Sequence, residues 1–111
     1  MKMKHVSDAK PVENPPQVFR KTLAYNAEAM LCSFELKKGA RIPLHNHRAT
    51  QIGYVISGHV QFLGEDTKDS FEVCSGDSYV FDAYKKHGAI ALEDTCFIEV
   101  FTPARDEYKD F

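Results

Sequence analysis

The sequence predicts a small all-β domain, a sandwich or a barrel of short strands. Apolar and polar residues alternate with period two along most of the chain, most clearly over residues 29–37 and 51–64. The apolar runs are short and closely spaced, and turns that often contain glycine separate them. No stretch carries the apolar stripe of an amphipathic helix. With 111 residues, the chain is long enough for one core and too short for a second.

An extended arm is expected first, because residues 1–20 are rich in proline and charged side chains. We assign residues 1–24 to this arm and a first strand, and residues 25–111 to the barrel. Turns separate the strands expected within the barrel, and they lie at 37–41 (KKGAR), Ser57-Gly58, 64–70 (GEDTKDS), Ser75-Gly76 and Glu93-Asp94. The Ser57-Gly58 pair is a tight hairpin signal.

Charge and composition argue against nucleic acid and membrane surfaces as partners. Lysine and arginine number 14 and aspartate and glutamate 16, for a formal net charge of −2. No apolar run reaches the length of a membrane span, and the first residues lack the apolar stretch of a signal peptide. Cys32, Cys74 and Cys96 form no C-x-x-C pair and lie in apolar runs. We therefore expect reduced core thiols in a cytoplasmic protein.

A histidine pair is the first functional signal. His45 and His47 lie one residue apart in a predicted strand, and side chains at i and i+2 of a strand project from the same face. Two imidazoles that face an apolar interior need hydrogen-bond partners or a cation. Taken alone, this spacing favours a solvent-facing pair on an edge strand over a metal site.

The surrounding residues resemble the two-motif signature of the cupin superfamily. The first motif is a glycine, five residues, H-x-H, three or four residues, an acidic residue or glutamine, six residues and a glycine. Its positions are filled by Gly39, His45, His47, Gln51 and Gly58, with glutamine in place of the more common glutamate. In the second motif, Gly76 and His87 keep the family's spacing. The turn between them departs from it, with Asp82 in place of proline and Tyr84 in place of glycine. The resemblance covers roughly residues 30–103 and implies a cupin β-barrel, a jelly roll or double-stranded β-helix.

The same resemblance implies a metal centre with four ligands, which are His45, His47, Gln51 and His87. Three imidazoles and a carboxamide oxygen suit one divalent transition metal ion such as zinc, nickel, manganese or iron. Because all four donors are neutral, the site keeps the full charge of the ion, which favours a Lewis acid. The same neutrality disfavours the higher oxidation states that an oxygen-activating iron centre needs.

The last predicted strand raises a question about Glu99. One parity of this strand holds Phe97, Glu99 and Phe101, and the other holds Cys96, Ile98 and Val100. If the phenylalanines face the interior, Glu99 is a buried carboxylate that needs a partner such as Arg105, an acid–base role, or both. If the other parity faces inward, Glu99 is solvated. Periodicity alone does not separate these alternatives.

This segment also resembles the small single-barrel cupins of pectin and alginate breakdown, the KdgF type, which carry D-x-F-x-P-x-R near the C-terminus. Here the pattern is filled by Glu99, Phe101, Pro103 and Arg105, with glutamate in place of aspartate. The resemblance implies a redox-neutral enzyme that opens 4,5-unsaturated uronates to linear keto acids. It makes Glu99 the candidate general acid or base. Arg105 would bind the carboxylate of the sugar acid, and Phe101 would exclude water.

Two other functions stay open on the same ligand set. An iron-dependent dioxygenase would use these donors but would lose all turnover without oxygen. A non-catalytic cupin would bind a small molecule and turn nothing over.

The proline-rich arm predicts a homodimer, because a small barrel can lay such an arm on a neighbour's sheet and cover an exposed strand edge. Deleting residues 1–16 is expected to shift the molar mass measured by light scattering from dimer to monomer. A dimer mass that survives the deletion contradicts this role of the arm.

Overall fold

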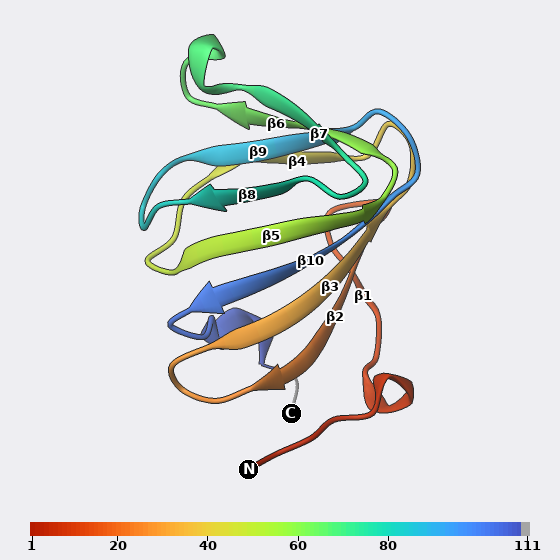
Figure 1. The fold of residues 1–111 in the computed structure, drawn as a ribbon, viewed down its shortest axis with the longest axis vertical. Coiled ribbons are helices and arrows are strands. Elements are labelled where there is room, and N and C mark those ends of the chain that lie inside the picture. The colour runs from red at the N-terminus through yellow and green to blue at the C-terminus, as the bar shows by residue number, and fades with distance from the viewer. Residues whose placement is uncertain (110–111) are drawn as a thin grey trace.

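The computed structural model describes residues 1–109 and contains two antiparallel β-sheets that face each other (Figure 1). The six-stranded sheet has the order β1 (Val12–Glu13), β2 (Val18–Tyr25), β3 (Met30–Leu36), β10 (Thr95–Thr102), β5 (Thr50–Ser57) and β8 (Ser78–Phe81). The four-stranded sheet has the order β4 (Arg41–His45), β9 (His87–Ala91), β6 (His59–Gly64) and β7 (Phe71–Cys74). The all-β prediction is confirmed. Hydrogen bonds do not close the two sheets into one barrel within the described residues.

The helical segments among the described residues are short 3-10 turns, η1 (Val6–Asp8), η2 (Thr67–Asp69) and η3 (Asp106–Tyr108). None of the helices described is long and apolar enough to pass through a membrane.

The chain crosses repeatedly between the two sheets, as in a jelly roll. The hairpin predicted at Ser57-Gly58 is wrong, because β5 pairs with β10 and β8, whereas β6 pairs with β7 and β9. The turn is tight, but it carries the chain from the six-stranded sheet to the four-stranded one. The turn at Glu93-Asp94 likewise joins strands of different sheets, β9 and β10. A local turn signal therefore located the strand ends but not the strand partners.

The core lies between the sheets and follows the predicted alternation. In β3, Met30 and Phe34 are buried, while their sequence neighbours are half-buried or, for Glu35, exposed. In β10, Phe97, Glu99 and Phe101 are buried, while the residues between them are half-buried. Phe34 stacks on Phe97 with ring centroids 5.4 Å apart. The structure thus decides the parity of the last strand, and Glu99 faces the interior.

The cysteines are only partly in this core. All three are free thiols; Cys32 is buried, Cys96 is half-buried and Cys74 is exposed. The expectation of three core thiols is therefore wrong for Cys74. Val73 points inward from β7, so its neighbour in an alternating strand must point outward.

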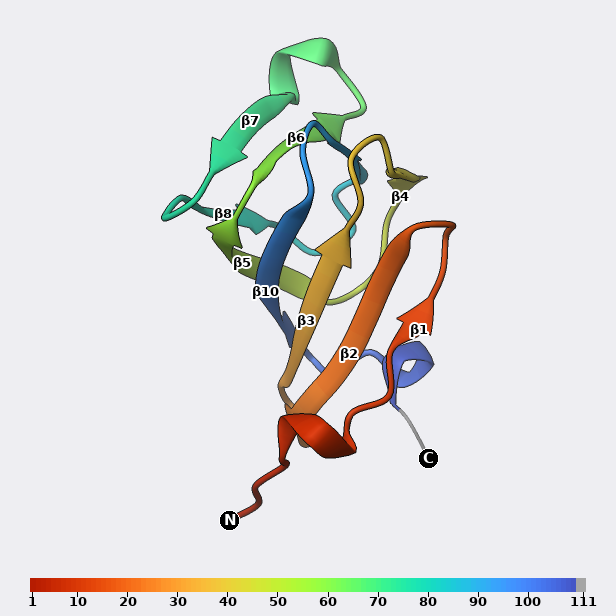
Figure 2. The same cartoon turned by 90° about the vertical axis from the view of Figure 1, so that its right-hand side faces the viewer.

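The N-terminal arm leads into the rim of a cavity. β1 pairs with the beginning of β2 at one edge of the six-stranded sheet (Figure 2). The connection between these strands carries Asn14 and Pro15, which line a cavity between the two sheets. β2 continues to Tyr25 and pairs with β3, so this strand belongs to the sheet that supports the site.

Gly58 lies at one crossing between the sheets. Its φ is +97°, and a Cβ added there would overlap the carbonyl oxygen of Asp94 in the neighbouring crossing. Gly76 has a similar φ of +92°, but an added Cβ would meet nothing within 4 Å. The two glycines therefore share the left-handed backbone and differ in the space around them.

We expect Gly58→Ala to lower the free energy of unfolding more than Gly76→Ala, by at least about 1 kcal/mol. The cost of the left-handed conformation, about 1–2 kcal/mol, is common to both variants. Only Gly58→Ala also forces apart the backbones of two turns. Urea denaturation followed by circular dichroism gives both values, and equal losses would mean that the close approach has no energetic cost.

Candidate metal centre

Three histidine rings meet between the two sheets. His45 ends β4 and pairs directly with His87, which begins β9. His47 lies in the bend that follows β4, not within the strand as its spacing suggested. The ring centroids of His45 and His87 are 4.5 Å apart, and that of His47 lies 5.7 Å from His45 and 5.1 Å from His87. One ring nitrogen of each lies within 4.8 Å of the others, so the three histidines are placed to hold a metal ion.

Backbone carbonyls set the tautomers of two of these rings. His45 Nδ1 lies 2.9 Å from the carbonyl oxygen of Pro43, and His87 Nδ1 lies 2.8 Å from that of Lys85. Each Nδ1 therefore donates its hydrogen, and each Nε2 keeps a lone pair. His87 Nε2 and His47 Nδ1 are buried and have no hydrogen-bond partner among the described residues. Metal-binding histidines typically donate the hydrogen of their other ring nitrogen to a backbone carbonyl, as His45 and His87 do here.

Burial favours the neutral form of His87 and His47. It lowers the pKa of His87 to about 4, and the charge of Arg105 contributes to the lowering. Burial also lowers the pKa of His47, again with a contribution from Arg105, while a hydrogen bond with Gln51 acts in the opposite direction. Metal ligands must be neutral imidazoles, so the environment favours the form that binds a cation.

Gln51 faces the three histidines from β5 in the opposite sheet. Its side chain is buried, and its Oε1 lies 3.0 Å from Nε2 of His47. Two donors that are each about 2.1 Å from one ion and at right angles to each other lie about 3.0 Å apart. The contact therefore has the spacing of two neighbouring ligands. The donor set and the unpaired Nε2 of His87 both fit a bound divalent ion.

Glu99 lies behind Gln51 and is 3% exposed. Its Oε2 accepts a hydrogen bond from Gln51 Nε2 at 2.6 Å and another from the Tyr79 hydroxyl at 2.6 Å. Burial raises the pKa of Glu99 to about 7, although these two hydrogen bonds and the charge of Arg105 partly oppose the rise. The expected partner, Arg105, instead forms its ion pair with Glu107, at 3.0 Å between Nη2 and Oε2.

Tyr79 is a site residue that the sequence analysis missed. Burial beside Glu99 raises the pKa of its hydroxyl far above the ordinary value, so the group stays protonated and donates. A buried tyrosine hydroxyl needs a partner, and Tyr79 lies on the inward parity of β8. That signal was available, but nothing in the sequence places β8 near β10.

Arg105 lies just beyond β10, at the start of η3. Its guanidinium carbon is 4.2 Å from the ring centroid of Tyr108 and 5.5 Å from that of Phe101, so two aromatic rings hold its plane. Phe101 also packs edge-on against His47, with ring centroids 5.8 Å apart. The structure thus brings Phe101 and Arg105 to the same region as the histidines.

The turn before His87 has Asp82 and Tyr84 in place of the family's proline and glycine, yet Tyr84 adopts a backbone conformation that suits glycine. Tyr84 has a φ of +64°, in the left-handed region that a glycine adopts readily. Its amide donates to the carbonyl oxygen of His47 at 2.7 Å, which ties the two motif segments together. The Tyr84 side chain is 63% exposed and does not line the main cavity.

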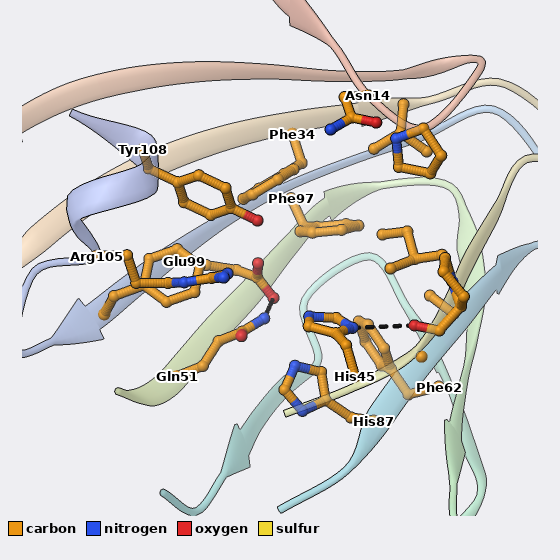
Figure 3. A pocket seen from close by; sticks show the side chains of 17 residues that line it. Asn14, Phe34, His45, Gln51, Phe62, His87, Phe97, Glu99, Arg105 and Tyr108 are labelled. Atoms are coloured by element: carbon orange, nitrogen blue, oxygen red, sulfur yellow. Dashed lines mark hydrogen bonds between the residues drawn. The ribbon is translucent and has the colours of Figure 1, made fainter. Parts of the chain in front are cut away.

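Several of these groups border one cavity of about 250 Å³, which Figure 3 shows from close by. Its polar wall includes His45, Gln51, His87, Glu99 and Arg105, and its apolar wall includes Phe34, Phe62, Phe97 and Phe101. Figure 3 also shows Gln51 directed at Glu99, and the imidazoles of His45 and His87 beside each other. The size suits a small molecule rather than a polymer.

Comparisons with known proteins agree with this architecture. The chain is similar to the structure of KdgF from Halomonas sp., with 28% identity, a TM-score of 0.87, and 98% of this chain and 99% of that chain covered. An RmlC-like cupin from Shewanella frigidimarina gives 24% identity and a TM-score of 0.88, with 98% and 96% covered. The polyketide cyclase RemF from Streptomyces resistomycificus gives 22% identity and a TM-score of 0.80, with 95% of this chain and 80% of that chain covered.

No curated protein sequence matches the chain. The Cupin domain family, however, matches residues 32–101, which include both histidine motifs and most of the last strand. Together with the two facing sheets and the converging histidines, this match shows that the chain belongs to the cupin family.

Proposed function

We propose that this cupin is a metal-dependent enzyme that opens 4,5-unsaturated uronates to linear keto acids. One observation carries the proposal: a buried carboxylate and an arginine border the same small cavity as His45 and His87, two of the three converging histidines. The resemblance of Glu99, Phe101 and Arg105 to the C-terminal pattern of the KdgF type supports this reaction, as does the likeness to KdgF from Halomonas sp.. The ligands would be His45, His47, Gln51 and His87, for one divalent transition metal ion.

The reaction needs a Lewis acid, a group that carries protons and an anchor for the substrate carboxylate. Opening the ring breaks the bond between the anomeric carbon and the ring oxygen, while one proton leaves the anomeric hydroxyl and one is added at carbon 4. No atom or electron is gained overall, so no redox partner is required. When bound, the metal ion would supply a Lewis acid that stabilises negative charge on a substrate oxygen.

Glu99 is the proposed proton carrier. Both of its hydrogen bonds go to Oε2, so Oε1 is left for the cavity that Glu99 lines. Its pKa of about 7 lies near neutrality, where a group can both accept and return a proton. Phe101 excludes water from one side of the same space.

Arg105 is the proposed anchor for the substrate carboxylate. Its side chain is 13% exposed, and aromatic rings restrict its orientation. Glu107 contacts Nε and Nη2 through a single oxygen, which leaves the Nη1 end of the fork for a ligand. A planar guanidinium recognises a carboxylate through two parallel hydrogen bonds.

Glu99→Gln is expected to lower kcat on an unsaturated monouronate by at least about 100-fold, because it removes the proton carrier. Loss of ultraviolet absorbance by the conjugated double bond measures the rate over a panel of such sugars. The matched control is Glu35→Gln, an exposed glutamate of β3, which should retain wild-type turnover.

Metal-stripped protein should also lose turnover and regain it with added divalent ion. Turnover should persist without oxygen, because the reaction is redox-neutral. Activity that survives both metal removal and Glu99→Gln contradicts the proposal, and turnover that requires oxygen favours the dioxygenase instead.

Arg105→Lys is expected to raise KM for the uronate about tenfold with little change in kcat, because lysine offers a point charge in place of a planar fork. Steady-state kinetics separate the two constants. Arg41→Lys, at an exposed position of β4, is the control. A fall in kcat at constant KM would mean that Arg105 acts on the reacting atoms and not on binding.

We also propose that the protein is a cytoplasmic homodimer. Free cysteines at all three positions support a reducing compartment. Exposed apolar side chains support self-association: Val6 and Val12 in the arm, and Ile52, Tyr54 and Val80 on the outer face of the six-stranded sheet.

A further inference from the structure

Three residues form a row across the inner face of the six-stranded sheet. In the ladder, Glu99 of β10 and Tyr79 of β8 both pair with Gly53 of β5, from opposite sides. Gly53 has no side chain, and a Cβ added there would overlap the ring and hydroxyl of Tyr79. The space above Gly53 is therefore what allows Tyr79 to reach across β5 to Glu99.

The hydrogen bonds in this row converge on one atom. Tyr79 and Gln51 both donate to Glu99 Oε2, each at 2.6 Å. The Gln51 amide thus has its nitrogen at Glu99 and its oxygen at the histidines, 3.0 Å from His47 Nε2. If the amide were reversed, its oxygen would face the acceptor Oε2 and its NH₂ group would face the imidazoles. An amide nitrogen has no lone pair to offer a cation, whereas the amide oxygen has two.

We propose that Glu99 and Tyr79 are positioning residues for Gln51, which hold its oxygen towards the metal. The proposal rests on the metal centre proposed above and assigns a role to two residues outside the ligand set. Glu99 selects the orientation of the amide, and Tyr79 keeps Glu99 in place. This positioning role of Glu99 is separate from proton transfer, since it uses Oε2 and leaves Oε1 free.

Tyr79 is needed because the guanidinium of Arg105 competes with Gln51 for the Glu99 carboxylate. Arg105 lines the same cavity as Glu99, so a carboxylate free to rotate would be drawn towards the guanidinium. The Tyr79 hydroxyl holds Oε2 on the side of the carboxylate that faces Gln51. Partners behind a metal ligand commonly change metal affinity by about 10–100-fold when they are removed.

The experiment measures the affinity of metal-free protein for zinc ions by competition with a chromophoric chelator, so no catalytic activity is involved. Tyr79→Phe keeps the ring and removes the hydroxyl, and it should weaken zinc binding by at least about tenfold. Gly53→Ala should give a similar loss, because it displaces the same ring. Tyr54→Phe changes an exposed tyrosine on the opposite face of β5 and should bind like the wild type.

A second background separates positioning from general damage. In Gln51→Ala protein the amide is gone, so Tyr79→Phe should cause no further loss of zinc affinity. An equal loss in both backgrounds, or no loss in either, would overturn the inference while leaving the metal centre intact. Wild-type protein that binds no zinc, cobalt or nickel would overturn the metal centre and this inference together. Urea denaturation of each metal-free variant verifies that the compared proteins are folded.

Discussion

The convergence of three imidazoles at one point between the two sheets is the constraint on which the rest of the site depends. Burial, with the neighbouring His45 and His47, opposes protonation of His87 and holds its pKa near 4. Contacts with backbone carbonyls use the Nδ1 atoms of His45 and His87, so the remaining nitrogens have lone pairs and nothing to donate. An unpaired buried polar atom costs about 1–3 kcal/mol. A divalent cation has the chemistry to satisfy several such atoms at once.

The two sheets contribute different parts of this site. The four-stranded sheet and its neighbouring bend supply the imidazoles, while the six-stranded sheet supplies Gln51, Glu99 and Tyr79 on its inner face. In a strand, a register slip of one residue would turn every inward side chain outward. The ladder of β10, β5 and β8 is therefore as important to the site as the histidine motif, because it brings Glu99 and Tyr79 to the two sides of Gly53.

The balance of charge links the site to the proposed substrate. Four neutral ligands would leave an ion's positive charge uncompensated, and Arg105 adds a further positive charge at the same cavity. Glu99 is the carboxylate that lines the cavity, and burial favours its neutral form. A cavity of this kind attracts an anion. The proposed sugar acid would bring both the negative charge that the cavity lacks and hydroxyl oxygens for a metal ion.

Spacing in the sequence was sufficient for the strand pattern and for grouping His45, His47 and His87, because a strand has a strict period of two and the family's motif has fixed intervals. It was insufficient for the inward parity of Glu99, since both sets of residues in that strand are apolar enough for a core. It also misassigned the turn at Ser57-Gly58 and the burial of Cys74. Tyr79 and Gly53 could not be assigned to the site at all.

The sequence by itself therefore determined the all-β class, most of the turns between strands and the three histidines that are placed to hold a metal ion. Each of these depends on side-chain periodicity or on short intervals along the chain. Only the tertiary structure decided which strands pair, which face of β10 is buried and which hydroxyl reaches Glu99. Those features depend on hydrogen bonds between strands far apart in the sequence, whose register no local pattern encodes.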